Sequence, residues 1–335
     1  MFRRFLAAAV VLVAAAALLI TAWPQLFGLQ RNALIAQLVS LRGLGAAAGL
    51  VLVVVLLTLA LLSRLARRLT FSLAVLLLVF AGMNTAVLAT RGFGSTDAVP
   101  DGPGITVLSW NTLGDATSAE EVARLALEVQ ADVVALPETN RQAADDIAGL
   151  MAAAGAPMAV HTVAFDQIAA ARSTSLLIGA DLGDYSVADG PSTSVLPSLV
   201  AKPDSGKGPT IIAVHAVSPT GDEMANWRRD LTWLAGACSG DNVIMAGDFN
   251  ATIDHMARMG SKPGATLGNC SDAATKAHSA AIGTWPTFLP AILGAPIDHV
   301  MATEQWRVSS AVVVEDRDHV GSDHRPIVVK LRHDR

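Results

Sequence analysis

Charged residues are scarce in this sequence. Only 16% of its 335 residues are Asp, Glu, Lys or Arg, whereas 52% are hydrophobic, and this balance excludes an ordinary soluble protein. The scarcity is uneven, because no charged residue lies between Arg4 and Arg31. The apolar excess is therefore concentrated at the N-terminal end, where a membrane is the environment that suits it.

Three uncharged apolar segments lie at that end, at residues 5–23, 43–63 and 69–90. Each is long enough for a helix to cross a hydrocarbon core of about 30 Å. Helices buried in a soluble core would show polar residues at helical spacing, but these segments are apolar on all sides. We therefore expect a transmembrane region over residues 1–91, in a multi-pass protein of the cytoplasmic membrane.

The first segment is open to a second interpretation. Arg3 and Arg4 precede an apolar run that ends in small residues near Thr21 and Ala22, which is also typical of a signal peptide. Cleavage would leave two spans and the same orientation for the rest of the chain.

The arginines outside these segments predict the orientation. They stand before the first segment and between the second and third, at Arg3, Arg4, Arg64, Arg67 and Arg68. The positive-inside rule places both regions in the cytoplasm, so the part after the third span is expected to be extracytoplasmic. Arg31 and Arg42, in the loop after the first segment, oppose this assignment without reversing it.

A basic surface is missing from the rest of the chain. Residues 1–100 hold eight arginines and one acid, a net charge of +7, while residues 101–335 hold 16 basic and 28 acidic residues, a net charge of −12. Non-specific binding to DNA depends on the release of counterions by basic side chains. The acidic outer part therefore disfavours nucleic acid as a partner.

Cysteine is limited to Cys238 and Cys270, both in the part predicted to face outward. An oxidising compartment permits a disulfide between them. Two separate buried thiols are the alternative, because the sequence does not show whether the two Cα atoms come within bonding distance. Both interpretations stay open at this point.

The remainder reads as one α/β domain. Residues 92–104, rich in Gly, Pro, Ser and Asp, predict a flexible linker. Ser118 and Glu121 form a capping-box signature that opens a helix between two strand-like runs, 105–110 and 132–138, and this β-α-β order is typical of an α/β domain. Later segments predict strands at 173–179, 210–217, 242–250, 297–303 and 326–331, a helix at 222–238 and a long excursion on the active-site side at 252–283.

Polar side chains stand at the ends of these apolar runs. A carboxylate, amide or imidazole follows or precedes strand after strand, at Asn111, Glu138, His215, Asp248, Asn250, Asp298, Asp323 and His324. Apolar strands that present such groups at one end predict a functional site at the edge of a sheet.

The motifs around these residues are LSWNT, LPET, VHAVSP, GDFNAT, PIDHV and GSDHRP, in this order. Together they resemble the endonuclease/exonuclease/phosphatase superfamily, which includes deoxyribonuclease I, neutral sphingomyelinases and inositol polyphosphate 5-phosphatases. The resemblance covers nearly all of residues 104–333. It implies a four-layer α/β sandwich of two packed mixed β-sheets flanked by helices, and a catalytic domain over residues 105–335. The implied activity is hydrolysis of a phosphodiester or phosphomonoester.

The resemblance also implies a divalent metal ion, Mg²⁺ or Mn²⁺. A phosphate ester is anionic, and oxygen ligands suit these cations. Glu138 is the first expected ligand. Asn111 is expected to help hold the metal or its waters, and Asp323 is expected to be a second ligand.

Five further residues receive catalytic roles from the resemblance. Asp248 is expected to orient and deprotonate the attacking water, and Asn250 to donate a hydrogen bond to a phosphate oxygen. His215 and His324 are expected to hold phosphate oxygens as charge builds up, and one of them to protonate the leaving group. Asp298 is expected to orient His324, as a carboxylate fixes the tautomer of a catalytic imidazole.

Other residues are assigned from their position alone. Alternation along a strand turns His299 away from Asp298, which favours a structural role. Asp166 is the expected partner of His215, and Trp285 lies either at the rim of the substrate site or in the core. The other histidines are expected on the surface, at His161, His255, His278, His319 and His333.

Three functions compete at this stage. The leading one is a phosphoesterase acting outside the membrane on a small, lipid-linked or cell-envelope phosphate, because tethering concentrates the domain at the lipid bilayer. The second is a membrane-tethered nuclease that degrades external DNA or RNA, which an acidic domain would do only with the help of bound cations. The third is an inactive binding module, which the retention of every expected polar residue disfavours.

Overall fold

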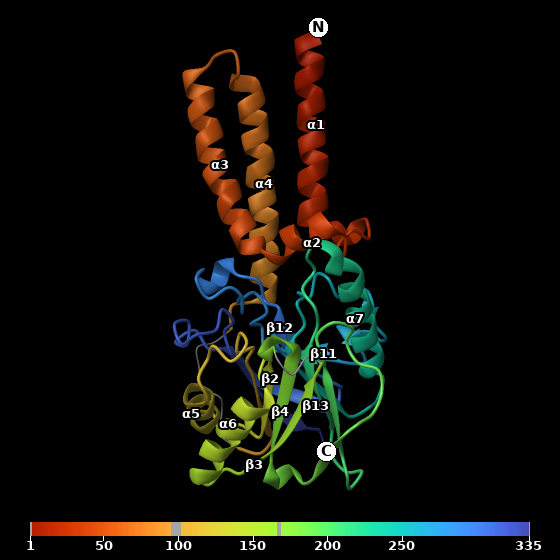
Figure 1. Ribbon diagram of the computed structural model, residues 1–335. Coiled ribbons are helices and arrows are strands. Elements are labelled where there is room, and N and C mark those ends of the chain that lie inside the picture. The colour runs from red at the N-terminus through yellow and green to blue at the C-terminus, as the bar shows by residue number, and fades with distance from the viewer. Residues whose placement is uncertain (1, 95–101, 166–168, 335) are drawn as a thin grey trace.

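Three long helices stand on one side of an α/β domain in the computed structural model, which describes residues 2–94, 102–165 and 169–334 (Figure 1). They are α1 (Phe2–Ala22), α3 (Arg42–Leu62) and α4 (Arg67–Arg91), and all three are long and apolar enough to cross a membrane. Their bounds agree with the predicted spans to within three residues. We call residues 2–91 the helical region.

Two short elements lie where the helical region meets the domain. They are the 3₁₀ turn η1 (Pro24–Leu26) and the helix α2 (Ala33–Ser40). In α2, Ala36 and Val39 are buried while Leu34 and Leu38 are exposed. The N-terminus and the turn between α3 and α4 lie at the opposite end of the long helices (Figure 1).

Two six-stranded mixed sheets form the centre of the domain. The first consists, in spatial order, of β13 (Trp306–Val313), β14 (Ile327–His333), β1 (Ile105–Ser109), β2 (Val133–Pro137), β4 (Ser173–Gly179) and β3 (Met158–Ala164). The second consists of β11 (Ser271–Asp272), β12 (Asp298–Ala302), β8 (Val243–Asp248), β7 (Thr210–His215), β6 (Leu199–Pro203) and β5 (Tyr185–Val187).

Helices and turns complete the domain. The α-helices are α5 (Ala119–Glu128), α6 (Arg141–Ala153), α7 (Met224–Ala237) and α8 (Ala273–Lys276). The 3₁₀ turns are η2 (Ala170–Arg172), η3 (Ala180–Leu182), η4 (Gly221–Glu223) and η5 (Ala291–Leu293). A small parallel pair joins β9 (Met259–Gly260) to β10 (Leu267–Gly268).

Alternation along the strands builds four layers, because successive side chains of a strand point to opposite faces. In β1, Val107 packs between the two sheets whereas Leu108 packs against the helices α5 and α6. In β8, Ile244 packs between the sheets whereas Met245 packs on the side of α7. The order is helices, sheet, sheet, helix, which confirms the predicted four-layer α/β sandwich.

The first predicted unit is also confirmed. β1 and β2 are parallel, and α5 connects them. The hydroxyl of Ser118 accepts a hydrogen bond from the backbone N–H of Glu121, as the capping signature predicts. Several elements were not predicted, among them α6, capped by the side chain of Asn140, and the edge strand β13, whose bulge near Ser310 interrupts its alternation.

Residues 252–283 are only partly the predicted active-site excursion. They carry β9 and β10, which contact α7, and β11 and α8, which contact β12. A disulfide joins Cys238 at the end of α7 to Cys270, with their Cα atoms 6.0 Å apart. Of the two interpretations of the cysteines, the disulfide is therefore the one observed. The start of this segment contacts the helical region instead of the catalytic residues.

The predicted surface position of His255 is wrong. Its ring is fully buried, and it bonds the carbonyl of Ala36 through Nε2 at 3.0 Å and the backbone N–H of Thr252 through Nδ1 at 2.9 Å. The reason is that α2, more than 200 residues away in sequence, covers it. Of the other histidines expected on the surface, His161 is half-buried and the rest are exposed: His278, His319 and His333.

The predicted linker 92–104 begins as a packed segment. The backbone N–H of Gly94 donates to the carbonyl of His278 at 2.8 Å, and the N–H of Ala281 donates to the carbonyl of Gly92 at 3.0 Å. Residues 95–101 of the predicted linker lie outside the described residues.

Candidate active site

The sheet topology brings the predicted site residues to one edge. Asn111 and Glu138 follow the parallel strands β1 and β2, while His215 and Asp248 end the parallel strands β7 and β8. Asp298 begins β12, which runs antiparallel to β8 and pairs Asp298 with Asp248. Asp323 and His324 precede β14, which runs antiparallel to β1. Strands of both directions therefore deliver polar groups to the same place.

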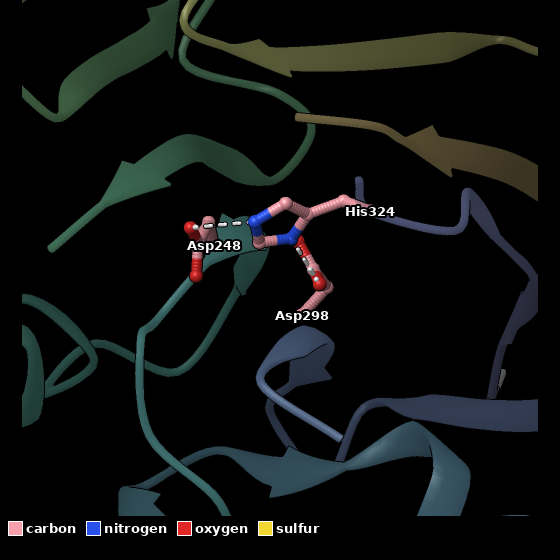
Figure 2. A group of neighbouring side chains, drawn as sticks. All are labelled: Asp248, Asp298 and His324. Carbon is pink, nitrogen blue, oxygen red and sulfur yellow. Dashed lines mark hydrogen bonds and ion pairs between the residues drawn. The ribbon is translucent and has the colours of Figure 1, made fainter. Parts of the chain in front are cut away.

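His324 lies between two carboxylates (Figure 2). Its Nδ1 donates to Oδ2 of Asp298 at 2.9 Å, and its Nε2 lies 3.9 Å from Oδ2 of Asp248. Burial opposes a positive charge on this ring, but the carboxylates of Asp298 and Asp248 outweigh burial and raise the pKa of His324. The two carboxylates therefore favour the protonated form of the ring. Asp298 contacts the ring directly, and its role in orienting His324 for catalysis stays a prediction.

Asp248 is buried and fixed by amide donors. Its Oδ1 accepts the backbone N–H of Asn250 at 2.7 Å, and its Oδ2 accepts the side-chain amides of Asn111 and Asn250, both at 3.1 Å. Burial, followed by the negative charge of Asp298, raises the pKa of Asp248. This carboxylate therefore takes up a proton more readily than an exposed one.

Asn250 lines the cleft and is already hydrogen-bonded within the protein. Its amide donates to the carbonyl of Ala216 at 2.9 Å as well as to Asp248, so both amide hydrogens are already used. Its φ of 45° is left-handed, a region that asparagine tolerates better than most residues. In this geometry Asn250 holds Asp248, and its hydrogen bond to a phosphate oxygen stays a prediction that requires one of these two contacts to be exchanged.

Glu138 is the most exposed of the carboxylates that face Asn111. Asn111 donates to its Oε1 at 3.1 Å, and Nε2 of His215 lies 3.9 Å from the same oxygen. Burial, with smaller contributions from Asp323 and Asp298, raises the pKa of Glu138. Its φ of 58° is left-handed, a strained conformation for a glutamate that is found preferentially at functional sites.

His215 is buried and neutral. Burial, followed by the positive charge of His324, lowers its pKa to about 3. Its Nδ1 lies 3.2 Å from the hydroxyl of Thr174, and its Nε2 has no hydrogen-bond partner among the described residues. Thr174 is a contact that the sequence did not reveal, and the predicted partner Asp166 lies outside the described residues.

Asp323 and Trp285 form the outer side of the site. The indole N–H of Trp285 donates to Oδ2 of Asp323 at 2.9 Å, and Oδ1 of Asp323 lies 3.9 Å from Nε2 of His324. Trp285 is half-buried. Of its two predicted positions, the structure has the one at the rim.

A cleft of about 320 Å³ connects these groups. Its lining includes the catalytic candidates Glu138, Asp248, Asn250, Asp323 and His324, together with Trp285. The same cleft is lined by Gln37, Ser40 and Leu41, so the helical region contributes to its wall. His299 lies outside this lining, with its Nδ1 2.9 Å from Asp272.

The donor set fits a hard divalent cation. Oδ1 of Asp298 and Oδ1 of Asp323 are buried without a hydrogen-bond partner among the described residues, and buried polar atoms of this kind need a partner. The ligand atoms of Asp248, Asp298 and His324 lie within 4.8 Å of one another. The predicted ligands Glu138 and Asp323 are not in this group, so their role as ligands stays a prediction. Asn111 presents its amide N–H groups to Glu138, so ligation through its oxygen requires the amide to turn over.

Comparison with known proteins agrees with this architecture. Residues 108–324 match the sequence profile described as "Endonuclease/Exonuclease/phosphatase family". Among curated proteins, none matches this chain.

Solved structures share the fold of the domain. A humanised D. rerio TDP2 with 14 mutations is 18% identical, with a TM-score of 0.52 over 68% of this chain and 98% of that chain. D. rerio TDP2 complexed with a single-strand DNA product is 16% identical, with a TM-score of 0.52 over 69% of this chain and 100% of that chain. An endonuclease/exonuclease/phosphatase from Bacteroides vulgatus is 16% identical, with a TM-score of 0.50 over 70% of this chain and 100% of that chain.

Proposed function

We propose that this chain, which belongs to the endonuclease/exonuclease/phosphatase family, hydrolyses a phosphate ester at the outer surface of the cytoplasmic membrane. As a member of that family it is a metal-dependent phosphoric ester hydrolase. The observation that carries the proposal is one cleft that holds Glu138, Asp248 and His324 together. Each of these side chains is held in place by hydrogen bonds to neighbouring residues, which favours a catalytic site over a site that only binds a ligand.

Glu138 and Asp323 would hold Mg²⁺ or Mn²⁺, with Asn111 supporting Glu138. The metal would neutralise charge on the phosphate and polarise its oxygens. His215, neutral and buried, presents Nε2 on the same side as Glu138. When Nδ1 accepts from Thr174, that Nε2 carries a proton and can donate to a phosphate oxygen.

Asp248 and His324 would carry out the proton transfers. Asp248 accepts a proton from the attacking water, because its raised pKa favours uptake and Asn111 and Asn250 hold its oxygens in place. His324, kept protonated by Asp298, stabilises charge on the phosphate and protonates the leaving oxygen.

The proposed orientation is supported by where the arginines of the helical region lie. The two that oppose an outward domain both bind the domain: Arg31 donates to the carbonyl of His255 at 2.7 Å, and Arg42 pairs with Asp254 at 2.8 Å. These contacts account for the two arginines in the loop after the first segment, so the arginines are no evidence that the loop lies in the cytoplasm. The disulfide between Cys238 and Cys270 also suits an oxidising compartment.

Orientation is tested with a reporter fused to the C-terminus. A reporter that is active only when exported should be active, and one that is active only in the cytoplasm should be silent. The reverse result would refute the extracytoplasmic placement.

Activity is tested with the purified full chain in lipid nanodiscs. The substrates are DNA, RNA, phospholipids, phosphoinositides and simple phosphate esters, each with and without a chelator. Chelator-sensitive hydrolysis of a lipid or small ester supports the proposal, and preference for DNA or RNA would support the nuclease alternative. Chelator-resistant hydrolysis, or none by a folded chain, would refute the mechanism.

A further inference from the structure

The short helix α2 belongs to the helical region, yet it lies at the catalytic cleft. Gln37, Ser40 and Leu41 line the same cleft as Glu138 and His324. These groups come from segments about 100 to 300 residues apart in sequence. The cleft is therefore shared between the helical region and the domain.

Specific contacts hold α2 in this place. Ala36 is fully buried in the cluster formed by α7 and the outer face of the second sheet, and its carbonyl accepts from Nε2 of His255 at 3.0 Å. The side-chain amide of Gln37 donates to the carbonyl of Pro219, in the loop after β7. The wall that α2 provides is thus part of the packed structure.

The residues that follow α2 attach the long helices to the domain. Arg42 begins α3, and its guanidinium donates to both oxygens of Asp254, at 2.8 and 2.9 Å, and to Oδ1 of Asn84 in α4 at 2.8 Å. Arg91, at the end of α4, lies 2.7 Å from the same carboxylate. We call these four residues the junction cluster. Arg42, Asn84 and Asp254 are buried, so the cluster attaches both α3 and α4 to the domain through buried contacts.

The position of α2 relates the cleft to the long helices. α1 ends at Ala22 and α3 begins at Arg42, and α2 lies where these helices meet the domain (Figure 1). With the long helices in the bilayer, as proposed, this place is the membrane surface. Its Leu34 and Leu38 are 67% and 49% exposed. An apolar face exposed beside spanning helices suits a helix that lies in the membrane interface.

The cleft is lined by two kinds of side chain. Charged groups that would act on a phosphate, such as Glu138 and Asp248, line it together with the apolar Leu41, Leu196 and Ile297. A ligand that contacts both kinds has a phosphate at one end and an apolar group at the other.

We propose that α2 is a substrate-binding wall, and that the substrate is a membrane amphiphile whose phosphate enters the cleft while its apolar chain stays against Leu41 and the bilayer. This inference rests on the proposed function and specifies its substrate class. It makes Leu41 a specificity-determining residue supplied by the helical region. A long nucleic acid would have to pass between the domain and the membrane to reach the same groups.

The kinetic test uses the full chain in nanodiscs and two esters with the same reacting group, methyl p-nitrophenyl phosphate and hexadecyl p-nitrophenyl phosphate. Wild type should show a higher kcat/KM for the hexadecyl ester. Leu41→Ser should lower the ratio of the hexadecyl to the methyl kcat/KM roughly tenfold, the effect of losing a leucine contact with an alkyl chain. Serine also suits the start of α3, so this variant should fold.

The matched control is Leu38→Ser, on α2 three residues before Leu41 and outside the lining of the cleft as far as the chain is described. Its ratio should equal that of wild type. An unchanged ratio in Leu41→Ser, an equal change in both variants, or a wild-type preference for the methyl ester would overturn the proposal.

A second measurement does not depend on activity, so its failure is separate from failure of the proposed function. Both native cysteines are in the disulfide, so Ser40→Cys introduces a single free thiol at the cleft wall. Hexadecyl phosphate in the nanodisc should slow labelling of this thiol by a maleimide, and methyl phosphate at the same concentration should not. Equal labelling rates with the two phosphates would overturn the proposal even if the chain hydrolyses another ester.

Discussion

Two clusters of buried charge lie in this molecule, and they are balanced in opposite ways. In the junction cluster one carboxylate meets two guanidinium groups. Burial alone would raise the pKa of Asp254, but Arg91 and Arg42 hold it well below its usual range. In the catalytic cleft carboxylates are in excess, and burial raises the pKa of both Asp248 and Glu138.

This difference in charge balance distinguishes the junction cluster, which is structural, from the cleft, which is suited to catalysis. A buried carboxylate whose charge is matched is already satisfied, and it stabilises the contact that matches it. A buried carboxylate without a matching cation is free to take up a proton or a metal ion. Changes at the junction cluster should therefore alter stability, whereas changes in the cleft should alter turnover.

The largest expected effect is on turnover and comes from the unmatched cluster. Asp248→Asn removes the proposed base and keeps the shape of the side chain. It replaces one acceptor oxygen by an NH2 group, and it also removes an unmatched buried charge. It should lower kcat by a factor of about 10²–10⁴, the usual contribution of general acid–base catalysis. Its melting temperature should stay close to that of wild type. Near-normal kcat would refute the assignment of Asp248 as the base.

The second effect is on stability and comes from the matched cluster. Asp254→Asn leaves Arg42 and Arg91 buried without a counter-charge, which should lower the free energy of unfolding by about 3–5 kcal/mol. Denaturant unfolding in micelles, followed by tryptophan fluorescence, measures it. Asp334→Asn is the control, because Asp334 and its partner Arg307 are exposed. Equal losses in the two variants would contradict the distinction between the clusters.

A third effect is pH-dependent and concerns His255, beside the junction cluster. Burial lowers the pKa of His255 from 6.5 to about 4, so the folded state binds a proton less readily than the unfolded state. Stability from this group is therefore complete above about pH 6.5 and is lost as the pH falls toward 4, with a loss of about 2 kcal/mol at pH 5. His255→Gln should show a correspondingly smaller fall between pH 7 and pH 5. The same pH dependence in both proteins would exclude His255 as the cause.

A fourth effect tests the proposal that the cleft binds a divalent cation through Glu138. Glu138→Gln should raise the Mg²⁺ or Mn²⁺ concentration needed for half-maximal activity by at least roughly tenfold, and high metal concentrations should restore part of the activity. Wild type should lose activity to a chelator and regain it when metal is added. A variant with an unchanged metal requirement would show that Glu138 is not a ligand.

The smallest effect is a comparison within the cleft. Asp298 is proposed to act only by positioning His324, so adding Asp298→Ala to His324→Ala should lower kcat by less than about threefold. The single variant Asp298→Ala should also shift the alkaline limb of the pH–rate profile to lower pH, because His324 loses a carboxylate that stabilises its charge. Independent, multiplying losses would show that Asp298 has a separate role.

Much of the catalytic site was predictable because its residues stand at fixed places in local patterns. Glu138 follows a run of five buried strand residues and Asp248 ends another such run, so their position at a sheet edge follows from strand periodicity. Ser118 caps its helix through a hydrogen bond to Glu121, only three residues away in the sequence. Local signals of this kind are present in the sequence itself.

Other features depended on contacts that no local pattern records. Thr174 meets His215 across 41 residues, and the amide of Asn250 is taken up by Ala216 across 34 residues. Helix α6 is different, because its cap Asn140 and the helical spacing of Ala144, Ile147 and Met151 are local signals that the prediction did not use.

The sequence by itself determined the three apolar spans, the α/β order of the domain and the set of polar residues at the strand ends, because each depends on spacing within a short segment. Only the tertiary structure decided that His255 is buried, that Asp254 neutralises two arginines, and that α2 lines the catalytic cleft. These depend on segments about 200 residues apart, where burial and charge are set by whichever surface folds against them.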